Sequence, residues 1–151
     1  MQRSMFALLL APIMVAAAPQ AVQLTSSVMQ ETTASVNGKE QVTLKAPTKV
    51  LPGDRLIMQT SYRNTNGQAV TKFVVTNPVP AAVAWTGDAT PGAVESVDGG
   101  RTYGPFAQLK VKGANGQLRA AQPDDVTHIR WVLASIAPGG SGVVKYRAMV
   151  R

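Results

Sequence analysis

The sequence predicts an all-β protein, a β-sandwich of about seven to nine short antiparallel strands. Three observations lead to this prediction. Val, Thr, Gly and Pro are plentiful, turn signals recur about every 8–12 residues, and segments between the turns alternate apolar with polar residues. Beyond the N-terminal segment, no stretch has the apolar stripe of an amphipathic helix. With 151 residues, of which 45% are hydrophobic, the chain can bury one core.

Residues 1–17 are predicted to be a secretory signal peptide. Arg3 supplies a positive start, Met5–Val15 an apolar run, and Ala17 a small residue at the cleavage site. Cleavage there would leave residues 18–151 as a single domain without a membrane span, located in the periplasm or secreted. The alternative is a retained membrane anchor, which is disfavoured because a proline interrupts the apolar run and polar glutamines follow too soon.

Cysteine is absent, so disulfides, thiol chemistry and Cys-based zinc sites are excluded. The net charge of +7 favours acidic surroundings, such as polyanionic glycans, lipid headgroups or nucleic acid. The charged residues are nevertheless scattered, without a long run of like charge, which is typical of solvated strand faces.

The mature chain begins with a predicted β-hairpin. Val22–Thr33 is rich in Val, Thr and Ser, and Gln41–Ala46 alternates cleanly, with Val42 and Leu44 on one side. Asn37-Gly38 between them is a strong signal for a two-residue turn. We therefore expect these two segments to pair.

The stretch Leu51–Pro80 predicts a second hairpin. Leu56–Asn64 alternates, and Val70–Asn77 is expected to turn back and pair with it, because an Asn-Gly pair lies between them. Prolines that lack a ladder donor then end the second strand. The predicted turn residues are Pro52, Gly53, Asp54, Asn66 and Gly67. The residues expected to face the core are Leu56, Met58, Thr60 and Tyr62.

The remaining chain is predicted to add short strands. They are Ala81–Thr86, Ala93–Val97, Arg101–Phe106, Leu109–Lys112, Val126–Leu133 and Gly142–Val150. A tight turn is expected at Asp98-Gly99-Gly100, and 113–125 is expected to be irregular and mobile. The side chains expected to face inward are Ile129, Trp131, Leu133, Val144, Tyr146, Ala148 and Val150.

Part of this pattern resembles a known family. Val50–Trp85 is similar to the bacterial surface domains called domain of unknown function eleven, and Ile136–Val150 resembles their closing Pro-Gly turn and strand. The matching positions are Pro52, Gly53, Asp54, Tyr62, Asn64, Asn77, Pro78, Pro80 and Ala81. The resemblance implies an exported, immunoglobulin-like sandwich of the kind that is often repeated in surface proteins. It does not imply catalytic activity. The sequence holds one copy and no sorting anchor, which departs from a wall-bound adhesin.

Ser96–Tyr103 also resembles the Asp-box of β-propeller glycosidases, whose pattern is Ser-x-Asp-x-Gly-x-Thr-aromatic. Those boxes are structural hairpins that recur once per blade, so a single copy predicts no propeller. The other interpretation is an ordinary turn in which the Asp98 carboxylate accepts backbone N–H groups.

The sequence predicts neither catalysis, a metal site nor a cofactor. His128 is the only histidine, and the neighbouring Asp124 and Asp125 are better explained as turn formers than as triad members. The loop acids Asp88 and Asp98 match no calcium-loop spacing, and the chain lacks the ligands of a transition-metal site.

Three functional interpretations stay open. The first is an exported structural or interaction module of the cell envelope, whose partner is another envelope protein or a surface polymer. The second is a carbohydrate or polyanion binder that uses Trp85, Tyr103 and Arg101, without specific nucleic-acid binding. The third is a pilus-like or adhesin subunit that assembles by strand pairing, with Val22–Thr33 as donor. An exposed Trp85 beside Tyr103 would favour the binder, and a buried Trp85 the module.

Overall fold

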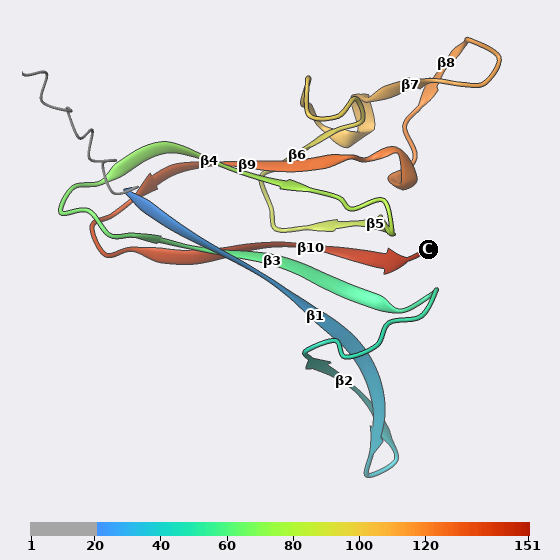
Figure 1. The fold of residues 1–151 in the computed structure, drawn as a ribbon, viewed down its shortest axis with the longest axis horizontal. Helices are drawn as coiled ribbons and strands as arrows, with labels where there is room; N and C mark the ends of the chain where they lie inside the picture. Colours follow the sequence, from blue (N-terminus) through green and yellow to red (C-terminus); the bar gives the residue numbers. More distant parts are fainter. Residues whose placement is uncertain (1–20) are drawn as a thin grey trace, which may run out of the picture.

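The computed structural model describes residues 21–151, so the predicted signal peptide at residues 1–17 lies outside the described residues. Figure 1 shows two antiparallel sheets packed one above the other, with a small separate hairpin at one end. The helical pieces of this described part are two single 3₁₀ turns, Phe106–Gln108 and Pro123–Asp125. The all-β sandwich prediction is therefore confirmed.

The larger sheet has five strands in the order β2-β1-β3-β10-β5. Its strands are β1 (Val22–Val36), β2 (Lys39–Lys45), β3 (Arg55–Asn64), β10 (Ser141–Val150) and β5 (Val83–Ala89). The smaller sheet has the order β4-β9-β6, and β7 pairs with β8 alone. These strands are β4 (Val70–Pro78), β9 (His128–Ile136), β6 (Ala93–Ser96), β7 (Lys110–Lys112) and β8 (Leu118–Ala120). Among the described residues, no helix is long or apolar enough to cross a bilayer.

The predicted first hairpin is present, and its turn has the expected geometry. Asn37 and Gly38 both adopt positive φ angles, 53° and 75°, as a type I′ turn requires. β1 is longer than predicted: Val22–Glu31 pairs with β3, and Gln30–Val36 pairs with β2 on the opposite edge. The β1–β2 end therefore projects beyond the sandwich (Figure 1).

The turn before β3 is also confirmed. Gly53 has a φ of 94°, and the Asp54 N–H donates to the Leu51 carbonyl at 3.0 Å, as in a type II turn. The Asp54 carboxylate accepts the Leu51 N–H at 2.8 Å and the Gln30 side-chain amide at 2.9 Å. This turn therefore joins the start of β3 to the middle of β1.

The predicted pairing of Val70–Asn77 with β3 is wrong. β4 pairs with β9 in the smaller sheet, so the chain crosses between sheets after Asn64. Asn66 and Gly67 lack the positive φ angles that a two-residue hairpin turn needs. Instead, the Asn66 N–H donates to the Asn64 side chain, which holds a wider connection.

Two later segments also differ from the prediction. Residues 113–125 contain β8 and a 3₁₀ turn, because Gly116 allows a turn at φ 79° and Arg119 forms an ion pair with Asp125. Arg101–Phe106 is not a strand, and only Gly104 bridges back to Glu95. The backbone after the turn is instead held by the Asp98 side chain.

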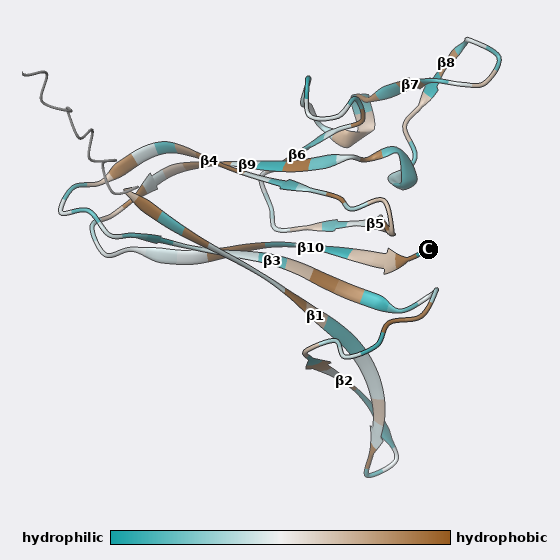
Figure 2. Ribbon diagram, viewed as in Figure 1, coloured by the Kyte–Doolittle hydropathy of each residue, from teal (hydrophilic) through white to brown (hydrophobic). Residues whose placement is uncertain are grey.

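The core lies between the two sheets, where the alternation predicted it. Trp131, Tyr146 and Ile129 are among the largest fully buried side chains. Figure 2 shows hydrophobic and hydrophilic positions mixed along β1 without strict alternation, and this strand is exposed over much of its length. The predicted inward-facing side chains that are buried are Leu56, Thr60, Ile129, Trp131, Val144, Tyr146 and Ala148, and those that are partly buried are Met58, Tyr62, Leu133 and Val150.

Candidate interaction site

Trp85, the first predicted ligand contact, belongs to the core. Its side chain is 5% exposed on β5 and meets Phe106 edge to face, with ring centroids 5.0 Å apart. The indole N–H donates to the Asp88 carbonyl at 3.1 Å, so its polar group is also occupied. Trp85 is therefore buried, which is the outcome that favours the module interpretation.

The turn after β6 is held by the Asp98 carboxylate, which accepts backbone N–H groups as the ordinary-turn interpretation predicts. Asp98 accepts the hydroxyl of Thr102 at 2.6 Å, the hydroxyl of Ser96 at 2.7 Å, and the backbone N–H groups of Arg101 and Thr102. Led by the Thr102 hydroxyl, these donors hold the pKa of Asp98 well below its usual range. Gly99 and Gly100 take positive φ angles here, so the predicted turn is confirmed.

Tyr103 follows this turn, and Arg101 is exposed within it. Tyr103 is partly buried, and the Arg130 guanidinium lies 3.5 Å from its ring centroid. Arg130 comes from β9 and also donates through Nε to the Thr76 hydroxyl at 3.2 Å. The structure thus places Arg130 against one predicted contact residue, Tyr103, while Arg101 is held by the Asp98 carbonyl in the same turn.

His128, Asp124 and Asp125 each contact a different partner and do not contact one another. The His128 ring contacts the Thr127 hydroxyl at 3.1 Å, whereas Asp125 pairs with Arg119 and Asp124 lies 3.8 Å from Arg151. Within residues 21–151, no group of three His, Cys, Asp or Glu side chains could hold a metal ion.

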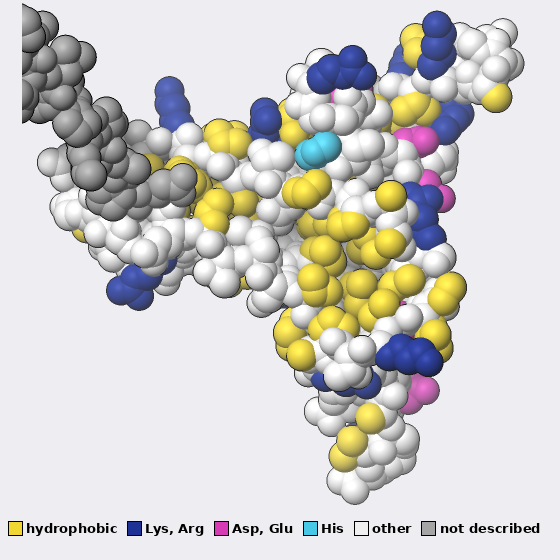
Figure 3. Space-filling model, viewed as in Figure 1, with side chains coloured by type: hydrophobic (Ala, Val, Ile, Leu, Met, Phe, Trp, Pro, Cys, Tyr) yellow, Lys and Arg dark blue, Asp and Glu magenta, His cyan; other side chains and the backbone are white. Residues whose placement is uncertain are grey.

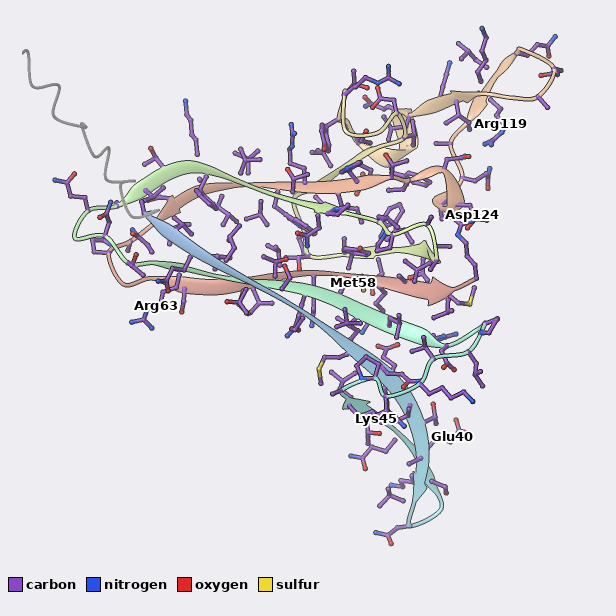
Figure 4. The ribbon with its side chains drawn as sticks, viewed as in Figure 1. Glu40, Lys45, Met58, Arg63, Arg119 and Asp124 are labelled. Carbon is purple, nitrogen blue, oxygen red and sulfur yellow. The ribbon has the colours of Figure 1, made fainter. Side chains whose placement is uncertain are left out.

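An apolar groove opens on one side of the sandwich, between β1 and the end of β4. It has a volume of about 240 Å³. Val28 and Met58 form its apolar floor with Tyr146, and Pro78 and Pro80 form one wall. Figure 3 shows hydrophobic side chains gathered on this side of the molecule, and Figure 4 places Met58 on β3 below the smaller sheet.

The groove exists because the smaller sheet does not extend over β1. Thr60 on β3 donates to the Asn77 side chain on β4 at 3.0 Å, and its hydroxyl also lies 3.2 Å from that of Ser26. Tyr146 donates to the Pro78 carbonyl at 2.9 Å. β4 is therefore fixed above β3 and β10, leaving Val28 of β1 partly exposed.

The edge of β1 beside this groove is unpaired. β2 covers only Gln30–Val36, so no strand in the described part of the chain pairs with Val22–Met29 on the side opposite β3. Backbone N–H and C=O groups along such an edge can accept another strand. The open edge and the groove together form the candidate interaction site.

No family model matches the chain, and neither a curated protein nor a solved structure matches it. The resemblance of Val50–Trp85 to the surface-domain family therefore stays a prediction. Several residues that carried it nevertheless have clear structural roles. Asp54 and Asn64 hold the two ends of β3, and Asn77 and Pro78 bind side chains of the larger sheet.

Sequence reasoning missed the groove and Arg130. The groove depends on the order of strands in both sheets, for which the sequence carries no direct signal. Arg130 alternates with the inward-facing Ile129 and Trp131, and the ring that it covers lies 27 positions earlier, across a turn. They meet because β6 pairs with β9 and Gly104, next to Tyr103, bridges back to Glu95 of β6.

Proposed function

We propose that this chain is an exported, non-catalytic interaction module of the cell envelope, which binds a partner protein at the open edge of β1. The signal-like segment at residues 1–17 favours export, so the mature chain would work in the periplasm or outside the cell. The burial of Trp85 disfavours a carbohydrate platform on its indole ring.

The observation that carries this proposal is the unpaired edge Val22–Met29 beside an apolar groove. An extended partner segment would pair its backbone with this edge, which is the general mode of strand addition. Because side chains alternate along a strand, every second partner residue would point toward the groove floor at Val28 and Met58. Apolar side chains at those positions would give the contact its specificity.

The size of the groove also favours this occupant. Pockets for small molecules usually measure about 300–1,000 Å³. The groove is smaller, about 240 Å³, and Ser26, Ser27 and Val28 of β1 belong to its lining. It therefore suits one or two apolar side chains held by a paired backbone better than a free small molecule.

The experiment is site-specific photo-crosslinking in cells that export the protein. A crosslinking residue at Ser27, beside the groove, should give a discrete adduct with a second protein, whereas one at Ser135 on β9 should not. Replacing Val28 with Asp should abolish the Ser27 adduct, and Val42→Asp on the projecting hairpin should not. Equal adducts from both positions would contradict the proposal.

The same experiment distinguishes self-assembly by strand pairing from binding to a different protein. The predicted donor, Val22–Thr33, is paired with β3 of its own chain over Val22–Glu31, so this segment would have to leave its sheet to act as a donor. An adduct of twice the mass of the chain would support self-assembly instead of binding to another protein. Sequencing the N-terminus tests export, since a chain that starts at Ala18 is expected.

A further inference from the structure

Cationic side chains from the smaller sheet and from the β7–β8 hairpin border the turn at Asp98, separate from the β1 groove. Arg130 of β9 lies over the Tyr103 ring, and Arg101 is exposed in the Asp-box turn that ends at Tyr103. Lys110 and Lys112 of β7 line a polar hollow of about 570 Å³ that borders the same turn at Asp98 and Thr102. We call the four cations Arg101, Lys110, Lys112 and Arg130 the basic face.

The carboxylates near the basic face are already engaged. Asp98 accepts hydroxyl and N–H donors of its own turn, and Asp125 receives both terminal nitrogens of Arg119, at 2.7 and 2.9 Å. Glu95 is buried, 5% exposed. The ion pairs found among the described residues involve Arg119, Arg147 and Arg151, so the basic face is not neutralised by the protein itself.

Both arginines are held in place by Nε, which leaves their terminal nitrogens available. Arg130 donates through Nε to Thr76, and Arg101 donates through Nε to the Asp98 carbonyl at 2.9 Å. The terminal nitrogens of these two side chains donate to no atom within residues 21–151. A planar guanidinium with free terminal N–H groups matches the two oxygens of a carboxylate or sulfate.

We propose that the basic face binds an acidic polysaccharide, with Arg101 and Arg130 contacting its carboxylate or sulfate groups. The Tyr103 ring does not offer a free stacking platform on the side that Arg130 covers, which disfavours the base stacking typical of single-stranded nucleic acid. Beside Arg130, the exposed Val74 and Val132 face each other across β4 and β9 and form an apolar strip. This strip suits the C–H faces of sugar rings between charged groups.

The test measures binding of the exported protein to polygalacturonate, with neutral dextran as the uncharged control. Polygalacturonate should bind and dextran should not. The variant Arg101→Gln/Arg130→Gln should weaken binding about tenfold and reduce the slope of log affinity against log salt by about one to two, because two contacts with anionic groups are lost. Tyr103 and His128 ring signals in NMR spectra should shift when polygalacturonate is added to the unmodified protein.

The matched control is Lys45→Gln/Arg63→Gln, which removes the same charge from the larger sheet. Figure 4 places Lys45 and Arg63 away from the end that carries Arg119. An equal loss of affinity in both double variants would overturn the proposal, because binding would then follow net charge alone. Tighter binding to single-stranded DNA or to anionic phospholipid vesicles, lost in the same arginine variant, would overturn it in favour of that ligand class. Arg101→Gln alone, at an exposed side chain, repeats the test without disturbing the Tyr103 stack.

Discussion

The side-chain nitrogen of Asn64 lies 2.9 Å from the carbonyl oxygen of Ile136, which joins β3 of the larger sheet to β9 of the smaller one. The same nitrogen lies 2.8 Å from the Gln68 carbonyl, and the Asn64 side-chain oxygen accepts the Asn66 N–H. Asn64 is fully buried. One amide therefore satisfies the backbone at the point where the chain crosses between sheets.

Replacing Asn64 with Ala should lower the free energy of unfolding by about 2–4 kcal/mol, because buried carbonyl and N–H groups lose their partner. Urea unfolding followed by tryptophan fluorescence measures this change. Asn66→Ala is the control, since its side chain is exposed and its N–H is retained, and it should change stability by less than about 0.5 kcal/mol. Equal effects at both positions would contradict the role given to Asn64.

Because of Tyr146, we expect the free energy of unfolding to fall at alkaline pH. Burial raises the pKa of this phenol to about 12, from an ordinary value of 10.0. The unfolded chain loses the proton first, so the stabilisation is complete below about pH 10 and is lost between about pH 10 and pH 12. A difference of about two pKa units corresponds to about 3 kcal/mol. Tyr146→Phe should be less stable at neutral pH, by about 1 kcal/mol, because the Pro78 carbonyl loses its donor.

Urea midpoints at several pH values measure this difference. Between pH 10 and 12, the Phe variant should lose less stability than the unmodified protein, since the titrating group is gone. Parallel curves for the two proteins would show that Tyr146 does not titrate differently in the folded state.

Gly142 lies opposite Tyr62 in the pairing of β10 with β3, and the phenol ring covers it. A methyl group at Gly142 would overlap that ring, so Gly142→Ala should destabilise the fold by about 1–3 kcal/mol. Gly67→Ala is the matched control, because nothing lies within 4 Å of its added Cβ and its φ is not positive. The control should be neutral or stabilising by up to about 1 kcal/mol. Thermal unfolding of the two variants distinguishes these outcomes.

The alternation of side chains predicted most of the strands and the core, because period-two burial depends only on neighbouring residues. It could not predict which strands pair. Val70–Asn77 was assigned to β3 by the Asn-Gly signal, yet β4 pairs with β9. The Asn-Gly signal is local, whereas the Asn64 side chain donates to carbonyls 72 and 73 positions away in the sequence. Such distant contacts decide the path of the chain after Asn64, and the local pattern does not report them.

Ile57 shows a second limit of the same reasoning. It lies on the outward face of β3 but is only 3% exposed. Its cross-strand neighbours are Met29 and Arg147, and Arg147 is held by ion pairs to Glu31 and Asp88. The long arginine side chain covers apolar surface while its charged end stays paired. Alternation predicts which face of the sheet a residue lies on, but not whether side chains of neighbouring strands cover it.

The Asp98 carboxylate should make the stability of the protein depend on pH in the acidic range. Its pKa lies well below the ordinary value of 3.8, chiefly because the Thr102 hydroxyl donates to it, so its charged form is favoured in the folded state. A lowered pKa contributes stability above the unfolded value, and that contribution is lost as the pH falls through the folded value. The Asp98→Asn variant should therefore be less stable than the unmodified protein at neutral pH, and the gap should narrow below about pH 4.

Asp124→Asn is the matched control, because that carboxylate is exposed and lies 3.8 Å from Arg151. Its effect on stability should be small at every pH, since exposed ion pairs contribute about 0–1 kcal/mol. Urea midpoints at neutral pH and at about pH 3 compare the two variants. A gap for Asp98→Asn that stays constant between the two conditions would mean that the Asp-box carboxylate has an ordinary pKa, and that the turn is held by its backbone alone.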